Sequence, residues 1–128
     1  MVFTGIVEGT GIISRIARKE NLSSITVQTP FNFNEGIQVG GSVCVDGVCL
    51  TIAKINQDSL EFDLIIETLK VTTFGNIKEK AIVNLERSMK LGDEIGGHMI
   101  SGHVFDTATI IKISEPENNY ILTLHIDS

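Results

Sequence analysis

The stretch SVCVDGVCLTIAKI, residues 42–55, determines which fold this chain can adopt. Two runs of β-branched and apolar residues flank the dipeptide Asp46-Gly47. An Asp-Gly pair between such runs is a strong signal for a β-hairpin, because both residues tolerate the positive φ angles of a two-residue turn. The stretch therefore predicts two antiparallel strands joined at residues 46 and 47.

Further strands are predicted on both sides of this hairpin. SSITVQT alternates between apolar and polar residues from Ser24 to Thr29, and AIVNLE, residues 81–86, is β-rich. SLEFDLI, residues 59–65, places Leu60, Phe62 and Leu64 on one face, with Glu61 and Asp63 on the other. ETLKVTTFGNI, residues 67–77, indicates a short helix or turn that stops at Gly75. Closely spaced strands without a long amphipathic helix favour a small antiparallel barrel or sandwich.

The composition narrows the function classes. The chain has 128 residues, a net charge of −6 and scattered Lys and Arg residues, which argues against a nucleic-acid or anionic-membrane partner. No apolar run approaches the roughly 20 residues that span a bilayer, and the N-terminus lacks the pattern of a signal peptide. We therefore expect a cytoplasmic protein in which Cys44 and Cys49 are free thiols. A hairpin disulfide between them is the less favoured alternative.

The two ends of the chain resemble each other. Residues 3–27 align with residues 100–124 without a gap, at an offset of 97. Eight of the 25 aligned positions are identical: Gly5/Gly102, Val7/Val104, Thr10/Thr107, Ile13/Ile110, Ile16/Ile113, Glu20/Glu117, Asn21/Asn118 and Thr26/Thr123. The glycine-rich run GGHMISGH, residues 96–103, then joins one copy of a repeat to the next.

Several polar residues allow two interpretations from the sequence alone. His98 and His103 lack the partners and the spacing of a metal site, so no metal is expected. His103 is an acid-base candidate or an exposed turn residue. Cys49 and Ser42 can be reactive groups, or a core thiol and a turn hydroxyl. The polar side chains of DLIIETL, residues 63–69, either bind a polar heterocycle or cap the short helix through Glu67 or Thr68.

Four motifs together resemble riboflavin synthase of the two-barrel type. They are MVFTGIVEGTG (residues 1–11), GGSVCVDGVCLTI (40–52), FDLIIETLKVTTFG (62–75) and VNLERSMKLGDEIGGHMISGHV (83–104). The resemblance extends from Phe3 to about Ile126. It implies an all-β fold, with a six-stranded antiparallel Greek-key barrel in residues 1–97. Residues 98–128 would then be the opening strands of a second, incomplete barrel, since the family continues well beyond this length.

The resemblance also implies an activity. The family converts two molecules of 6,7-dimethyl-8-ribityllumazine into riboflavin and 5-amino-6-ribitylaminouracil, without a metal or an organic cofactor. Its members are homotrimers, with each active site between barrels of neighbouring subunits. A single barrel would instead pair as a homodimer. The alternative is a catalytically incompetent single-barrel fragment or a lumazine- or flavin-binding protein. The short length of the chain favours the binding protein.

The resemblance assigns site residues position by position. Ser42, Cys49 and His103 match the polar residues that the family places near the reacting carbons. The expected substrate contacts are Gly5, Ile6, Val7, Cys49, Leu50, Thr51, Asp63, Leu64, Ile65, Ile66, Glu67, Thr68, Gly102, His103 and Val104. Among these, residues 5–7 are expected to contact the second lumazine of the pair.

Overall fold

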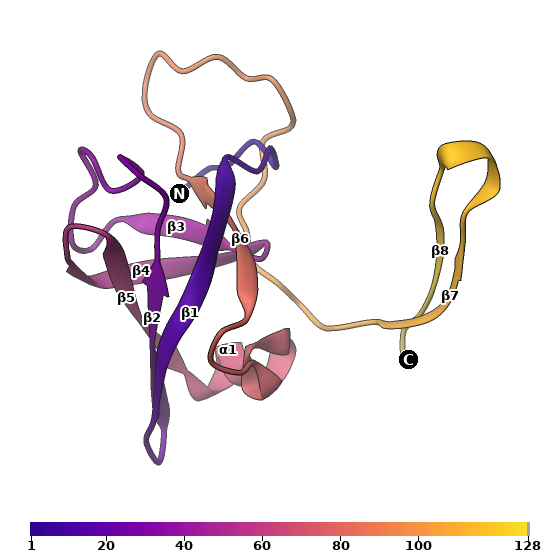
Figure 1. Ribbon diagram of the computed structural model, residues 1–128, viewed down its shortest axis with the longest axis horizontal. Helices are drawn as coiled ribbons and strands as arrows, with labels where there is room; N and C mark the ends of the chain where they lie inside the picture. The colour runs from indigo at the N-terminus through magenta and orange to yellow at the C-terminus, as the bar shows by residue number, and fades with distance from the viewer. Residues whose placement is uncertain (128) are drawn as a thin grey trace.

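The structure is a computed structural model that describes residues 1–127. Six strands form a closed antiparallel barrel in the order β1-β2-β5-β4-β3-β6 (Figure 1). Their bounds are β1 Gly9–Arg18, β2 Leu22–Gln28, β3 Ser42–Val45, β4 Val48–Ile55, β5 Ser59–Ile65 and β6 Ile82–Arg87. Strands β3, β4 and β5 follow one another by hairpins, and β5 comes back to lie beside the earlier strand β2, which is a Greek-key arrangement. The predicted six-stranded Greek-key barrel is confirmed.

The predicted hairpin joins β3 to β4. Asp46 and Gly47 have φ angles of 47° and 80°, as a two-residue type I′ turn requires. The strand ends Val45 and Val48 face each other across this turn. The Asp46 carboxylate also accepts a hydrogen bond of 2.6 Å from the backbone N–H of Asn84 in β6. This turn therefore closes one hairpin and attaches it to the neighbouring strand.

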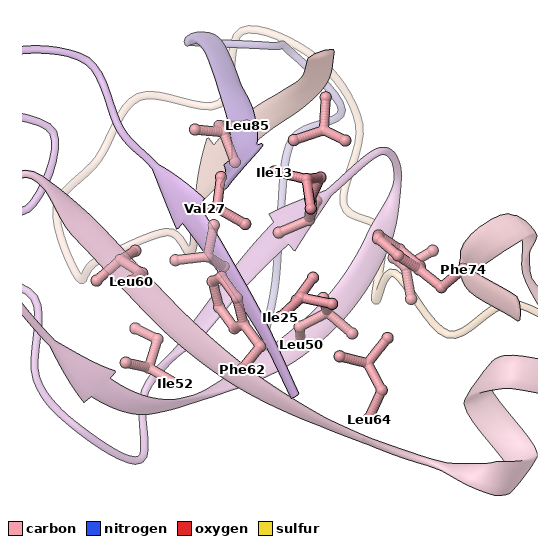
Figure 2. Close-up of a cluster of buried hydrophobic side chains, with 14 of the residues drawn as sticks. Ile13, Ile25, Val27, Leu50, Ile52, Leu60, Phe62, Leu64, Phe74 and Leu85 are labelled. Atoms are coloured by element: carbon pink, nitrogen blue, oxygen red, sulfur yellow. The ribbon is translucent and has the colours of Figure 1, made fainter. Parts of the chain in front are cut away.

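Alternating side chains of the strands fill the interior of the barrel (Figure 2). Leu60, Phe62 and Leu64 of β5 are at most 1% exposed, while Asp63 between them faces outward. Leu50 and Ile52 of β4 and Ile25 and Val27 of β2 extend this core on the two strands that flank β5. The strand periodicity read from residues 59–65 is confirmed, because β5 has these bounds.

A short helical segment covers one end of the barrel. Helix α1, Ile66–Val71, follows β5 directly, and the 3-10 turn η1, Thr73–Asn76, brings the buried Phe74 onto the core. The capping role considered for Glu67 or Thr68 is wrong, because Ile65 precedes the helix without a side-chain cap. The helix stop expected at Gly75 is also wrong, since α1 ends at Val71. Thr72 lies between α1 and η1 and caps the start of η1, because its hydroxyl accepts a hydrogen bond from the Phe74 N–H.

Residues beyond the barrel repeat its opening hairpin. Strands β7, Thr109–Ser114, and β8, Ile121–His125, are joined by the 3-10 turn η2, Pro116–Asn118, and form a separate two-stranded sheet (Figure 1). Every pairing in this hairpin equals a β1–β2 pairing shifted by 97. Even the register shift between Ile13 and Arg15 recurs between Ile110 and Lys112. The repeat seen in the sequence is therefore a repeat of backbone geometry.

The second hairpin is exposed on both faces. Ile110 and Leu124, which correspond to the buried Ile13 and Val27, are 53% exposed each. An isolated hairpin of this kind is at best marginally stable in water. No helix among residues 1–127 has the length and apolarity needed to cross a membrane.

Candidate functional site

Two chain segments that are far apart in sequence pair with each other on the outside of the barrel. Phe3 and Ile100 exchange two backbone hydrogen bonds, of 2.8 and 2.9 Å. Their positions differ by 97, so equivalent points of the two repeat copies pair with each other. Two residues past this bridge, the equivalent glycines Gly5 and Gly102 both adopt positive φ angles, of +86° and +75°. The residues 3–7 form the first segment and the residues 100–104 the second.

Glu86 of β6 holds the first segment. Its carboxylate is buried and accepts three hydrogen bonds, from the Thr4 N–H at 2.8 Å, the Thr4 hydroxyl at 3.1 Å and the Gly5 N–H at 3.1 Å. Beyond Gly5, the side chains of Ile6 and Val7 are 49% and 51% exposed. The first segment is therefore fixed by two backbone N–H groups and the Thr4 hydroxyl, and it presents two apolar side chains to the outside.

The second segment lies on the start of β4. The Gly102 carbonyl accepts a hydrogen bond of 2.9 Å from the Cys49 N–H. A Cβ atom at position 102 would lie 2.9 Å from the Cys49 Cβ and 3.0 Å from its N, so only glycine fits there without a shift. Val104 packs against the edge of the barrel core. These contacts bring His103 next to Cys49, although the two are far apart in sequence.

A cleft of about 190 Å³ opens where this second segment, β4 and α1 converge. Its lining residues are Val48, Cys49, Glu67, Thr68, Val71, Thr72, Gly102, His103 and Val104. Three valines form an apolar wall, and a thiol, a carboxylate, two threonines and an imidazole lie among them. Such a mixture suits a flat heterocycle, which needs apolar contact on its faces and hydrogen bonds at its edge.

Six of the expected site residues line this one cleft: Cys49, Glu67, Thr68, Gly102, His103 and Val104. Three cleft residues have no signal in the sequence pattern, namely Val48, Val71 and Thr72. Thr72 shapes the cleft from behind, because its hydroxyl also donates to the Thr68 carbonyl at 2.6 Å. Its place after a helix of only six residues is visible in the structure alone.

The other expected contacts lie in different places. Gly5 and Val7 line a second hollow of about 330 Å³, together with Cys44 and Glu86. Ser42 lines a third, of about 160 Å³, beside Arg87. The structure therefore brings Cys49 and His103 together and leaves Ser42 on a different part of the barrel surface.

The remaining expected residues are held in the wall of the barrel and at the start of α1. Leu50 and Leu64 point into the barrel core. Thr51 is exposed, and Asp63 accepts a hydrogen bond of 2.6 Å from the Ser24 hydroxyl. Ile65 and Ile66, at the junction of β5 and α1, are 59% and 46% exposed.

The surroundings of the Cys44 thiol weaken its acidity. Burial and the adjacent Glu86 carboxylate raise the pKa of its thiol to about 11. The thiol is therefore protonated near neutral pH, so Cys44 is a weak nucleophile there. Cys49, which is half-buried at the edge of the cleft, is the more accessible of the two thiols.

Known proteins match both the sequence and the fold. The family model of the lumazine binding domain matches residues 4–88. Riboflavin synthase of Escherichia coli (strain K12) is 44% identical over 118 residues, which are 92% of this chain and 55% of that protein. Riboflavin synthase of Bacillus subtilis (strain 168) is 34% identical over 98% of this chain and 58% of its own length. The chain thus spans about half the length of these relatives.

Solved structures of LumP resemble the chain closely. The complex of LumP with 6,7-dimethyl-8-(1'-D-ribityl) lumazine superposes with a TM-score of 0.86 at 29% identity, over 98% of this chain and 69% of the other. The complex with riboflavin gives 0.85 at the same identity, over 98% and 67%. The resemblance to riboflavin synthases read from the four motifs is confirmed, and the chain belongs to the lumazine binding domain family.

Proposed function

We propose that the cleft between β4, α1 and the second segment binds 6,7-dimethyl-8-ribityllumazine, and that the chain acts as a lumazine-binding part of a riboflavin synthase. The observation that carries this proposal is the convergence of six expected contacts, from three separate parts of the sequence, on one cleft. The known ligands of the LumP structures support the choice of ligand.

The size of the cleft suits one part of the ligand. Ligand pockets that bury a small molecule are usually about 300–1,000 Å³. At about 190 Å³ the cleft accepts the ring or one of its edges and leaves the rest uncovered. The open side would be covered by a second lumazine and by another barrel. The exposed Ile6 and Val7 are suited to contact that second lumazine.

The polar groups have distinct proposed roles. Glu67 and Thr68 stand at the start of α1, where they can hydrogen-bond to the ring edge or to the ribityl hydroxyls. Thr51, on the outer face of β4, is placed to extend this set of hydrogen bonds along the ribityl chain. Val48 and Val104 supply apolar contact to the face of the ring.

The proposed reaction transfers a four-carbon unit between two lumazines. One lumazine loses a proton from its 7-methyl group, and the resulting carbanion attacks the other ring, which serves as the electron sink. Holding two rings close and antiparallel supplies most of the acceleration, as a proximity effect. His103 would move the proton or position a water molecule, and Cys49 would activate a nucleophile that adds to the acceptor ring. Ser42 is the alternative for this second role, acting from its neighbouring hollow.

A catalytic centre needs two barrels under this proposal. In a protein of the full family length, the second barrel and a homotrimer would supply the facing surface. For the barrel described here, a homodimer is the alternative assembly. The division at residue 97 into a first barrel and the start of a second is part of the same proposal. It is supported by the repeated register of β1–β2 and β7–β8.

Binding without catalysis is the second candidate function. The specific observation in its favour is the close superposition on LumP in complex with lumazine, riboflavin and flavin mononucleotide, at TM-scores of 0.86, 0.85 and 0.81. This function needs only the cleft and one ring.

One experiment separates the two functions. The chain is mixed with 6,7-dimethyl-8-ribityllumazine, and absorbance and fluorescence are followed for lumazine loss and riboflavin formation. Riboflavin formed with the consumption of two lumazines supports the synthase. A saturable change in lumazine fluorescence without riboflavin supports the binding protein. If the lumazine signal does not respond to the protein at all, both functions are refuted.

A further inference from the structure

The two cysteines of the chain stand directly opposite each other. In the β3–β4 ladder Cys44 pairs with Cys49, one position beyond the Val45–Val48 pair that flanks the turn. Both are free thiols. The side chains of directly opposed residues in an antiparallel ladder lie on the same side of the sheet. Here that side is the outside of the barrel, because the neighbouring Val43, Val45 and Leu50 are buried in the core.

The hydrogen bonds identify the type of this pair. The Cys49 N–H donates to the Gly102 carbonyl of the second segment, so it points away from β3. Cys44 and Cys49 are therefore a non-hydrogen-bonded pair, in which opposed Cα atoms lie about 4.5 Å apart and the side chains stand closest. A disulfide spans Cα separations of about 4.4–6.8 Å. The ladder thus holds the two thiols at the lower end of the range for a disulfide.

The surroundings make the two thiols unequal. Cys44 is 5% exposed and pairs with Glu86 on its other side. Cys49 lines the cleft and is the more open of the two. The charge of Cys49 is also among the influences that raise the pKa of Cys44, as expected for thiols in close proximity. A reagent from solution therefore reaches Cys49 first.

We propose that Cys44 and Cys49 form a reversible cross-strand disulfide when the protein meets a low-molecular-weight disulfide. The Cys49 thiol loses its proton, and its sulfur attacks one sulfur of the reagent. The S–S bond of the reagent breaks, and the leaving thiolate takes up a proton. The Cys44 thiol then loses its proton and attacks Cys49 Sγ, which breaks the mixed disulfide and releases the second half of the reagent as a thiol. The two cysteines lose two electrons, and the reagent gains them.

The bond would be labile and would change the cleft. It closes a loop of only a few residues that the hairpin already holds, so it restricts the unfolded chain little. Exposed or strained disulfides are the ones that reducing thiols reverse. While it exists, Cys49 Sγ is tied toward β3 and its thiol is lost from the cleft beside His103. This pair is therefore a site at which oxidation changes the lining of the cleft, and the inference holds whether or not the cleft binds lumazine.

The test is thiol chemistry on the intact chain. The reduced protein is incubated with glutathione disulfide, trapped with an alkylating reagent and weighed by mass spectrometry. We expect the wild type to lose both alkylatable thiols and two hydrogen atoms, without bound glutathione, and to regain both thiols in excess glutathione. Peptide mapping should place the bond between residues 44 and 49.

Variants make the result specific. Cys44→Ser should stop at the mixed disulfide, with one glutathione bound at Cys49, because the second thiol is missing. Cys49→Ser should stay largely unmodified, since Cys44 is covered. Circular dichroism checks that each variant is folded, and Cys44→Ala replaces the serine variant if it is not. A wild type that accumulates bound glutathione as the Cys44 variant does, or that forms only bonds between chains, would overturn the proposal.

Discussion

Replacing Gly102 by alanine should detach the second segment from the barrel. A residue other than glycine at a φ of +75° costs about 1–2 kcal/mol. The new Cβ would also lie 2.9 Å from the Cys49 Cβ. Together these effects amount to about 2 kcal/mol or more, whereas the hydrogen bond from Cys49 to the Gly102 carbonyl contributes about 0.5–1.5 kcal/mol. We therefore expect the segment to leave β4 and to take His103 out of the cleft.

The consequence is measured by fluorescence titration with 6,7-dimethyl-8-ribityllumazine. A docking energy of about 0.5–1.5 kcal/mol that is reduced by about 2 kcal/mol lowers the docked fraction, and with it the apparent affinity, by about 3- to 10-fold. Urea denaturation of the barrel should change little, because the second segment lies outside the strand ladder. The matched control is Gly40→Ala, which has a φ of +87° but no atom within 4 Å of the new Cβ. If Gly102→Ala binds lumazine as tightly as Gly40→Ala does, the docking of this segment is not what forms the site.

Three further outcomes follow from single side chains. The free energy of unfolding should fall by about 1.3 kcal/mol between pH 8 and pH 10. The reason is that the folded state keeps the Cys44 proton, with a pKa of about 11, whereas the unfolded state releases it near pH 9.0. In Cys44→Ala this part of the pH dependence should be absent, and an unchanged slope would contradict the assignment. Phe62→Ala, in the middle of the core, should lower the free energy of unfolding by about 3–5 kcal/mol in urea denaturation, and a loss below about 1 kcal/mol would mean that Phe62 does not pack as described. Glu86→Gln leaves only one acceptor oxygen for three donors, so amide hydrogen exchange at Thr4 and Gly5 should become faster by tenfold or more. Equal exchange rates in the variant and the wild type would show that the carboxylate does not hold the first segment.

The strands that sequence reasoning recognises are those with strict alternation or a strong turn. Asp46-Gly47 and residues 59–65 meet this condition, and the structure has the hairpin and β5 where they are expected. Strand β1 does not stand out by alternation, because its register shifts between Ile13 and Arg15. This shift places an extra residue in the strand, so the apolar positions no longer recur at every second residue. Its existence is visible in the sequence only through the repeat.

The site depends on long-range contacts that periodicity does not encode. Nothing in the residues alone places His103 beside Cys49, and the resemblance supplies that expectation. The structure gives its physical basis, in the Phe3–Ile100 bridge and the close approach of Gly102 to β4. The valines of the cleft wall are likewise not predictable from periodicity. In the sequence Val48 and Val71 are ordinary apolar residues, and only the folded chain brings β4 and α1 together around the cleft.

We propose that lumazine binds where β4, α1 and the second segment meet. Backbone amide chemical shifts of the wild-type chain, recorded during titration with 6,7-dimethyl-8-ribityllumazine, test this most directly. We expect saturable shifts concentrated at Cys49, Thr68 and His103. Absence of saturable shifts, or shifts concentrated instead around the hollow of about 650 Å³ between Thr29 and Asp58, would contradict it.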